Sequence, residues 1–393
     1  MMTENPAAEF DAEIDLAQLR TRTSEKWAKY PSDVLPVFVA ESDFPLAAPI
    51  AQALHRAVDL GDLGYATQPN KVGEAYAKFS RQRFGLTTDP ASAFIITDVM
   101  VGVAEILRIV TAPGDKVIIN PPVYPPFFST ISEVGRSILE IPLIAQEGNL
   151  VLDFAALERG FASGARVYVL CNPHNPAGRA FSHGDVLQIA RLCRRYDVTV
   201  LADEVHAPLV LPGASHTPLE SLVAQTSVHA ITLTSASKGW NIAGLKCALA
   251  ISSSAWGRSV LQRLPGPPSD RTGQLGIIAT VAAFSDGAEY LDRIVKHLDQ
   301  QRVTLQRLLA ENDLRKIRYM PPEAGYLAWL DCEELGLGPD PAASFLGLGK
   351  VALVSGLDFG SQGAYHARLN FATSTPILRE AVIRMSRATA AAT

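Results

Sequence analysis

The stretch that decides the fold reads Ser235-Ala-Ser-Lys238-Gly-Trp-Asn-Ile-Ala-Gly-Leu-Lys246, and its central feature is an isolated lysine among small and apolar residues. An amine in such surroundings loses solvation of its charged form, so its pKa falls. The neutral amine that results can attack a carbonyl group. The stretch therefore predicts that Lys238 is a nucleophile.

Two other interpretations of Lys238 exist. Most lysines are solvated surface groups, and a Ser-x-Ser-Lys string alone says little. Serine acyl enzymes also carry Ser-x-x-Lys, which Ser235 and Lys238 match, but their companion motifs Ser-Asp-Asn and Lys-Thr-Gly do not occur in this sequence. The carbonyl partner that a buried lysine favours is the cofactor pyridoxal phosphate, and the residues upstream of Lys238 test this hypothesis.

Composition indicates an ordinary soluble globular protein with a large core. The 393 residues are 48% hydrophobic and 19% charged, which suggests two or three domains. The formal net charge of -5 and the lack of a long basic block argue against a nucleic-acid partner. The short basic cluster Arg191 to Arg195 is best explained as the solvated face of a helix.

Cysteine usage and the N-terminus favour a cytoplasmic setting. The four cysteines are scattered, without a CxxC pair or a recognisable set of metal ligands, so no metal site is expected. Residues 1–6 lack the basic and apolar segments of a signal peptide. The apolar run 99–110 is interrupted by Glu105 and Arg108, so no membrane span is expected either.

Short apolar runs alternate with amphipathic segments through the middle of the chain, which is typical of an α/β sheet covered on both faces. Nearly continuous apolar strands fit burial on both sides, as parallel strands require. A helix is predicted over 185–196 from its apolar spacing. The predicted strands are Lys116 to Asn120, Arg166 to Cys171, Val198 to Ala202, Ala230 to Thr234 and Cys247 to Ser252.

Two long helical patterns frame this region, at 72–84 and 288–312, and the second is long enough to link two domains. Beyond it, strands are expected at 325–330 and 367–371. The alanine-rich tail after Met385 is expected to fray. The predicted organisation is an N-terminal segment over 1–50 that joins the small domain, a large cofactor-binding domain over 51–288 and a C-terminal small domain over 289–393.

Polar residues follow two of the predicted strands, at the place where open α/β sheets bind ligands. The first set is Cys171-Asn-Pro-His-Asn175-Pro-Ala-Gly178, which is either a plain turn or a rigid turn that orients a ligand through its asparagines. The second is Asp203-Glu204. A buried carboxylate needs a partner, and a protonated ring nitrogen would supply one for Asp203. Glu204 is expected to be a structural hydrogen-bonding group.

The order of these motifs resembles the fold-type I pyridoxal-phosphate enzymes of the aspartate aminotransferase superfamily. Asn-Pro-x-Gly, Asp-x-x-His and Ser-x-Ser-Lys follow one another, with Asp203 28 residues after Asn175 and Lys238 35 residues after Asp203. The resemblance covers about residues 39–373. It implies a large domain with a mostly parallel seven-stranded sheet between helices, and a smaller α/β domain built from both termini.

The resemblance also implies roles for individual residues. Lys238 matches the Schiff-base lysine, Asp203 the partner of the pyridinium nitrogen and Asn175 the ligand of the phenolic oxygen. Arg368 matches the arginine that binds the substrate carboxylate, and Ala40 is a second candidate for substrate binding. The remaining matches are Tyr124, which stacks on the ring; Ser235 and Lys246, which bind the phosphate; and Tyr65, which reaches the cofactor of a second subunit and so implies a homodimer. Singly, each tyrosine could be turn packing, and Arg368 could be a structural ion pair.

Two positions depart from the superfamily pattern. The phosphate loop has no early glycine and reads Thr97-Asp-Val-Met-Val-Gly102, so the amides of Met100 and Val101 are the candidates there. His206 stands where many aminotransferases carry a tyrosine to the phenolic oxygen. We expect it to contact the cofactor, with its role left open.

Within the superfamily, further motifs of this sequence resemble those of the cystathionine β-lyase or C-S lyase branch. They include Asp203-Glu-Val-His206 and the Lys-Gly-Trp-Asn sequence that begins at Lys238. The activity implied is α,β-elimination of cystathionine or a related S-substituted L-cysteine to thiol, pyruvate and ammonia, with Lys238 as both anchor and base. An aminotransferase acting on an amino acid and a 2-oxo acid is the alternative enzyme. A regulator that binds a partner protein on the same scaffold is the alternative of another class.

Overall fold

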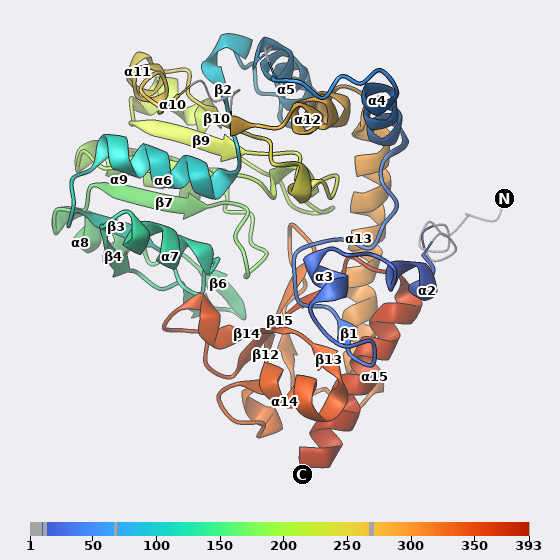
Figure 1. Ribbon diagram of the computed structural model, residues 1–393. Helices are drawn as coiled ribbons and strands as arrows, with labels where there is room; N and C mark the ends of the chain where they lie inside the picture. The colour runs from blue at the N-terminus through green and yellow to red at the C-terminus, as the bar shows by residue number, and fades with distance from the viewer. Residues whose placement is uncertain (1–9, 11–13, 67–68, 267–270, 393) are drawn as a thin grey trace.

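A seven-stranded sheet forms the centre of the larger part of the molecule (Figure 1). The computed structural model describes residue 10 and residues 14–66, 69–266 and 271–392, so the prediction for residues 1–6 lies outside it. Only β10 runs antiparallel to its neighbours, which confirms the mostly parallel sheet. In spatial order the strands are β2 (Ala93–Ile96), β10 (Ala248–Ile251), β9 (Ala230–Thr234), β8 (Thr199–Asp203), β7 (Val167–Cys171), β3 (Lys116–Ile119) and β4 (Ser137–Glu140).

Helices cover both faces of this sheet because successive strand residues point to opposite sides. On one face Val169 and Leu201 pack with α6 (Val99–Val110), α7 (Pro126–Glu133) and α11 (Ala255–Leu261). On the other face Leu170 and Val200 pack with three further helices. These are α8 (Phe154–Ala162), α9 (His183–Arg195) and α10 (Glu220–Thr226).

The smaller part is an antiparallel sheet with helices packed around it, and both end regions of the chain contribute to it. Its strands lie in the order β11 (Arg318–Tyr319), β12 (Leu327–Asp331), β15 (His366–Asn370) and β14 (Val354–Ser355). From the N-terminal side, β1 (Leu35–Pro36) pairs in parallel with β13 (Val351–Ala352). The small domain is thus built from both ends of the chain. Its other elements are α2 (Leu16–Leu19), α3 (Glu25–Ala28), α14 (Pro341–Gly349) and α15 (Thr375–Ala392).

The helix α13 (Ala288–Glu311) extends from the large domain into the small domain and joins the two parts (Figure 1). The domain boundaries after residues 50 and 288 stay a prediction. Near the start of α13 lie α4 (Ala48–Asp59), α5 (Pro69–Phe84) and α12 (Gln274–Asp286). The remaining short elements are the hairpin of β5 (Ile144–Gln146) and β6 (Asn149–Val151), and 3-10 helices at Pro90–Ser92, Ala207–Leu209, Ala243–Leu245, Glu333–Leu335 and Gly356–Phe359.

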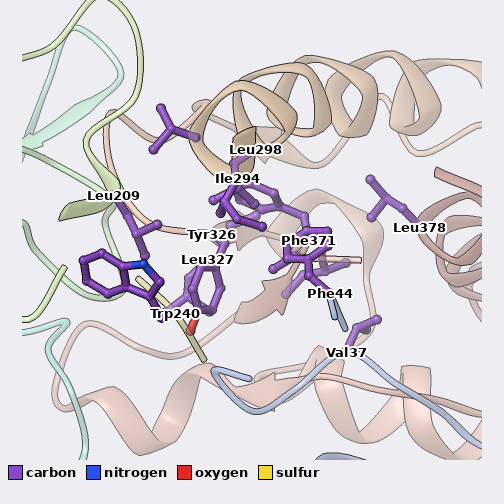
Figure 2. Packing of buried hydrophobic residues seen from close by; sticks show 14 of the residues in the cluster. Val37, Phe44, Leu209, Trp240, Ile294, Leu298, Tyr326, Leu327, Phe371 and Leu378 are labelled. Atoms are coloured by element: carbon purple, nitrogen blue, oxygen red, sulfur yellow. The ribbon is translucent and has the colours of Figure 1, made fainter. Parts of the chain in front are cut away.

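One apolar cluster continues from the large domain through α13 into the small domain (Figure 2). Trp240 and Leu209 come from the large domain, Ile294 and Leu298 from α13, and Tyr326 from the small domain. Burial of these side chains supplies the main favourable free energy for holding the two domains together. The two domains are therefore joined by a continuous packed core.

The C-terminal tail is helical, whereas the sequence predicted that it frays. The alanine-rich segment after Met385 continues α15 to Ala392, and the side chains of Met385 and Ala388 are fully buried. Alanine has the highest helix propensity, and the buried side chains anchor these turns, so the expectation of a frayed tail is wrong. Among the described residues, none of the helices combines the length and apolar character needed to cross a membrane.

Candidate functional site

A cavity of about 400 Å³ lies where β7, β8 and β9 end, at the ligand-binding edge of the sheet. The strand register places Cys171 of β7 beside Asp203 of β8. Residues that the sequence predicted from distant segments come together here. The cavity is lined by Ala40, Met100, Tyr124, Asn175, Asp203, His206, Ser235, Lys238, Lys246 and Arg368 among the predicted residues.

The amine of Lys238 lies inside this cavity, and its Nζ donates a hydrogen bond to the Ala40 carbonyl at 3.2 Å. Burial and, to a smaller extent, the nearby Arg368 guanidinium lower the pKa of Lys238 to about 8. Glu41 and Asp203 act in the opposite direction. The neutral amine is consequently accessible near neutral pH, as a nucleophile or general base requires.

Asp203 ends β8 with its carboxylate buried in the cavity wall. Its Oδ1 accepts a hydrogen bond from the Val205 N–H at 3.1 Å. Burial raises the pKa of Asp203 to about 6, so a cationic partner would stabilise its charged form. The neighbouring Glu204 instead bonds His216 at 3.1 Å and the Leu219 N–H at 2.8 Å, which confirms its structural role.

Asn175 and Arg368 lie side by side across the crevice. The Arg368 Nη1 donates to Asn175 Oδ1 at 3.1 Å, and its Nη2 donates to the Phe38 carbonyl at 3.2 Å. The guanidinium carbon lies 5.0 Å from the centre of the Phe359 ring. Arg368 is buried and forms no ion pair with a carboxylate of the described residues. This contradicts the interpretation of Arg368 as a purely structural ion pair. The side chain is oriented but keeps donors available for an acid ligand.

Small hydroxyls and one lysine form another wall of the cavity. Ser235 Oγ donates to the Cys247 carbonyl at 2.7 Å and accepts from the Ser237 N–H at 3.1 Å. Lys246 forms an ion pair with Asp98, the N-cap of α6, with Nζ and Oδ2 3.0 Å apart. A bound phosphate would share Lys246 with this carboxylate.

Two predicted residues lie outside the cavity. Val101 lines a separate small hollow, and its N–H already donates to Asp98 Oδ1 at 2.8 Å, so only Met100 of the predicted pair borders the site. Tyr65 is 90% exposed and does not line the cavity of its own chain. Tyr124 does line it, and burial raises the pKa of its hydroxyl, which keeps this group neutral.

His206 is buried between the cavity and Gly325. Burial lowers its pKa to about 3, with Lys238 and Arg368 adding to the shift, so the imidazole is neutral. A Cβ at Gly325 would approach the His206 Nδ1 to 3.3 Å, tighter than most contacts. The glycine at 325 therefore leaves room for this ring.

The sequence reasoning missed several residues of the wall. Asp98 was not predicted because only backbone amides were considered as ligands in the loop over 97–102. An aspartate before a helix is a common N-cap, so its position carried a signal. Ser237 stands inside the quoted lysine motif and could have been found there. Tyr326 gave no signal in the sequence, yet its hydroxyl donates to the Ala40 carbonyl at 2.9 Å. The other unpredicted lining residues are Val39, Val99, Cys171, Val205, Ala243 and Cys247.

Comparison with known proteins finds similar sequences and structures over nearly the whole chain. A protein of Mycobacterium leprae is 43% identical over 98% of this chain and 99% of its own length. Cystathionine beta-lyase PatB of Bacillus subtilis is 33% identical, with 91% of this chain and 93% of that protein covered. The PLP-bound C-S lyase from Staphylococcus hominis superposes with a TM-score of 0.89 at 25% identity, covering 97% and 98% of the two chains.

The family model for aminotransferase class I and II matches residues 44–385, a range that holds both sheets and nearly all of the cavity wall. The crevice that joins Lys238, Asp203 and Arg368 thus lies within the matched range. The chain belongs to the aminotransferase class I and II family.

Proposed function

We propose that this protein is a pyridoxal-phosphate-dependent carbon-sulfur β-lyase that acts on cystathionine or a related S-substituted L-cysteine. The observation that carries the proposal is the convergence of a buried amine, a buried carboxylate and a buried guanidinium, from Lys238, Asp203 and Arg368, on one cavity. Relatives named as cystathionine beta-lyase cover nearly the whole chain and select this reaction within the family.

The residues present fit the cofactor. The carboxylate of Asp203 is buried without a cationic side chain bonded to it in the described structure, which suits a protonated ring nitrogen. Lys246, Ser235, Ser237 and the N-terminus of α6 would hold the phosphate. Tyr124 would cover the ring and Asn175 would bond its phenolic oxygen. The volume of the cavity is in the range of small-molecule sites.

The chain's own groups would then divide the work of elimination. Pyridoxal phosphate, when bound, supplies an aldehyde for an amine and a ring that withdraws electrons from the substrate Cα. Arg368 would hold the substrate carboxylate through paired N–H donors. The Lys238 amine would take the proton from Cα, after which the Cβ–S bond breaks and its electron pair leaves with sulfur. The thiol and aminoacrylate are released, and hydrolysis of the aminoacrylate by water gives pyruvate and ammonia.

A homodimer with shared sites is part of this proposal. The support is Tyr65, whose large ring is 90% exposed and lies on a segment next to α4. An exposed aromatic of this size suits burial by a second copy of the chain, where its hydroxyl would reach the phosphate of the partner's cofactor. The four cysteines are buried and free, which fits a reducing cytoplasm as the place of action.

The test is the release of pyruvate and thiol from cystathionine by the purified protein without any added 2-oxo acid. The lyase produces pyruvate at a steady rate under these conditions, whereas an aminotransferase stops after converting its own cofactor. Lys238→Ala should abolish both turnover and covalent attachment of the cofactor. Turnover that begins only after a 2-oxo acid is added would overturn the lyase proposal, and a near-native rate in Lys238→Ala would overturn the role of the lysine.

A further inference from the structure

The backbone around Ala40 forms a tight turn in front of Lys238. The Glu41 N–H bonds the Val39 carbonyl at 2.9 Å, which places Ala40 at the apex. The Ala40 carbonyl is left on the outside of this turn. It accepts one hydrogen bond from Lys238 Nζ at 3.2 Å and a second from the Tyr326 hydroxyl at 2.9 Å.

Two asparagines hold this turn in place. The buried Asn370 of β15 donates to the carbonyls of Val39 and Glu41, both at 2.7 Å. Asn241 closes a reciprocal pair with the Ser42 backbone: its Oδ1 accepts from the Ser42 N–H at 2.9 Å, and its Nδ2 donates to the Ser42 carbonyl at 3.0 Å. Every backbone carbonyl from Val39 to Ser42 therefore has an assigned side-chain partner.

The contact between Asn241 and Ser42 links the segment of Lys238 to the turn at Ala40. Asn241 lies three residues after Lys238, so the segment that carries the lysine is tied directly to the turn that carries its acceptor. Asn241 has a left-handed backbone with φ of +55°, a conformation that costs energy for a residue with a side chain. The chain keeps this conformation where the carboxamide can reach both polar groups of Ser42.

We propose that Asn241 is a positioning residue for the reaction: it fixes the Ala40 carbonyl as the hydrogen-bond acceptor of the free Lys238 amine. The inference rests on the proposed role of Lys238 as base and deepens it. When substrate has displaced the lysine, the amine must stay beside Cα and must carry the proton it removes. A fixed carbonyl favours the protonated, donating form and restricts where the amine can lie.

Other groups act on the charge of Lys238 from the elements around it. Arg368 of β15 and Lys246 disfavour the ammonium form, whereas Asp203 of β8 and Glu41 favour it. His206 and Tyr326 border the same space as neutral groups. The Ala40 carbonyl is the acceptor bonded to Nζ, so its loss should lower the pKa of Lys238.

The test compares Asn241→Gly with Glu147→Gly. Glycine accepts the left-handed backbone at 241, so the exchange removes the contact with Ser42 without adding strain. Glu147 is an exposed hairpin residue with φ of +50° and controls for the backbone effect. In Asn241→Gly we expect kcat to fall about tenfold or more with KM within about threefold, and the acidic limb of the kcat profile to move to lower pH. Glu147→Gly should match the wild type.

A second readout needs no turnover. The full-length protein freed of cofactor is mixed with pyridoxal phosphate, and covalent uptake is followed by absorbance across pH. Covalent uptake needs the neutral amine of Lys238. The rise of uptake with pH should therefore also occur at lower pH in Asn241→Gly than in the wild type. This result would stand even if C–S cleavage proved not to be the reaction. An unmoved limb with kcat within twofold, or a rise in KM alone, would overturn the proposal. If Asn241→Gly does not fold, Asn241→Ser takes its place with the same expected direction.

Discussion

Arg368 Nη1 and Asn175 Oδ1 lie 3.1 Å apart although 193 residues separate them in the chain. Arg368 stands on the small-domain sheet, and Asn175 follows a strand of the large sheet. This bond joins the group proposed to bind the substrate carboxylate to the group proposed to bind the cofactor. Movement of one domain against the other would disturb both groups at once.

Replacing Arg368 with lysine should mainly weaken substrate binding. Lysine keeps the charge but cannot bond Asn175, the Phe38 carbonyl and a carboxylate together, because it lacks the planar fork. We expect KM to rise about tenfold or more with a smaller fall in kcat. Steady-state kinetics on cystathionine measure both constants. Unchanged saturation behaviour would mean that the carboxylate is bound elsewhere.

Asp203 should make the cofactor-free chain less stable as pH rises from about 4 to 6. Its pKa in the folded chain is about 6, above the unfolded value of 3.8, so the folded state retains a proton that the unfolded state has lost. The stabilisation present below pH 4 is lost through pH 6, by up to about 3 kcal/mol. Asp203→Asn should remove this part of the slope.

Urea unfolding of the cofactor-free protein at several pH values measures the effect. His174 and His206 act in the opposite direction, because their pKa values are lowered in the folded chain, so the difference between wild type and Asp203→Asn isolates the aspartate. Exposed Asp286→Asn is the matched control. Parallel pH curves for wild type and Asp203→Asn would contradict the prediction.

Trp240→Phe should destabilise the fold by about 1–3 kcal/mol. The indole N–H donates to the buried Gly287 carbonyl at 2.9 Å, and phenylalanine leaves this acceptor without its partner. The ring also packs edge-on against Phe79 and Phe284. Denaturant unfolding followed by circular dichroism measures the loss. Trp256→Phe, at a partly exposed site stacked on His229, should cost less, and equal losses would argue against the hydrogen bond.

Tyr65→Phe should weaken cofactor retention without affecting the fold of the single chain. Its hydroxyl makes no contact with the cavity of its own chain, so an effect would have to come through a second copy. Sedimentation should give a dimer, and dialysis should remove the cofactor faster from Tyr65→Phe than from the wild type. Tyr365→Phe, another exposed tyrosine, serves as control. A monomer with full cofactor retention would refute this assignment.

The sequence predicted the elements of the large sheet closely because parallel strands buried on both faces leave nearly continuous apolar runs. The run ending at Asp203 is an example, predicted at 198–202 and observed at 199–203. The tail after Met385 was misjudged because its burial depends on packing against a distant helix that local composition does not reveal. Gly349 of α14 shows this contact: a Cβ there would lie 3.0 Å from that of Ala388.

The candidate site was predictable where chemistry and local spacing coincide, as at Lys238 and Asp203. Arg368 and Tyr124, which come from remote segments, were expected only through the family resemblance, and the contacts formed where remote segments meet were not predicted. Tyr326 lies 286 residues from the Ala40 carbonyl that it bonds, and no period or motif links them. Val101 lies outside the cavity and its N–H already donates to Asp98, a bond that the N-cap position of this aspartate could have indicated.

The reversed strand of the large sheet, β10, determines where the loop that carries Lys238 lies. Because it runs against β9, with Leu249 opposite Thr234, the connection between them leaves and returns at the same edge. Both ends of that connection, Ser235 and Lys246, therefore line the cavity, and Lys238 lies on the loop between them. One loop thereby supplies the reactive amine and two of the residues proposed to bind phosphate to the same edge of the sheet.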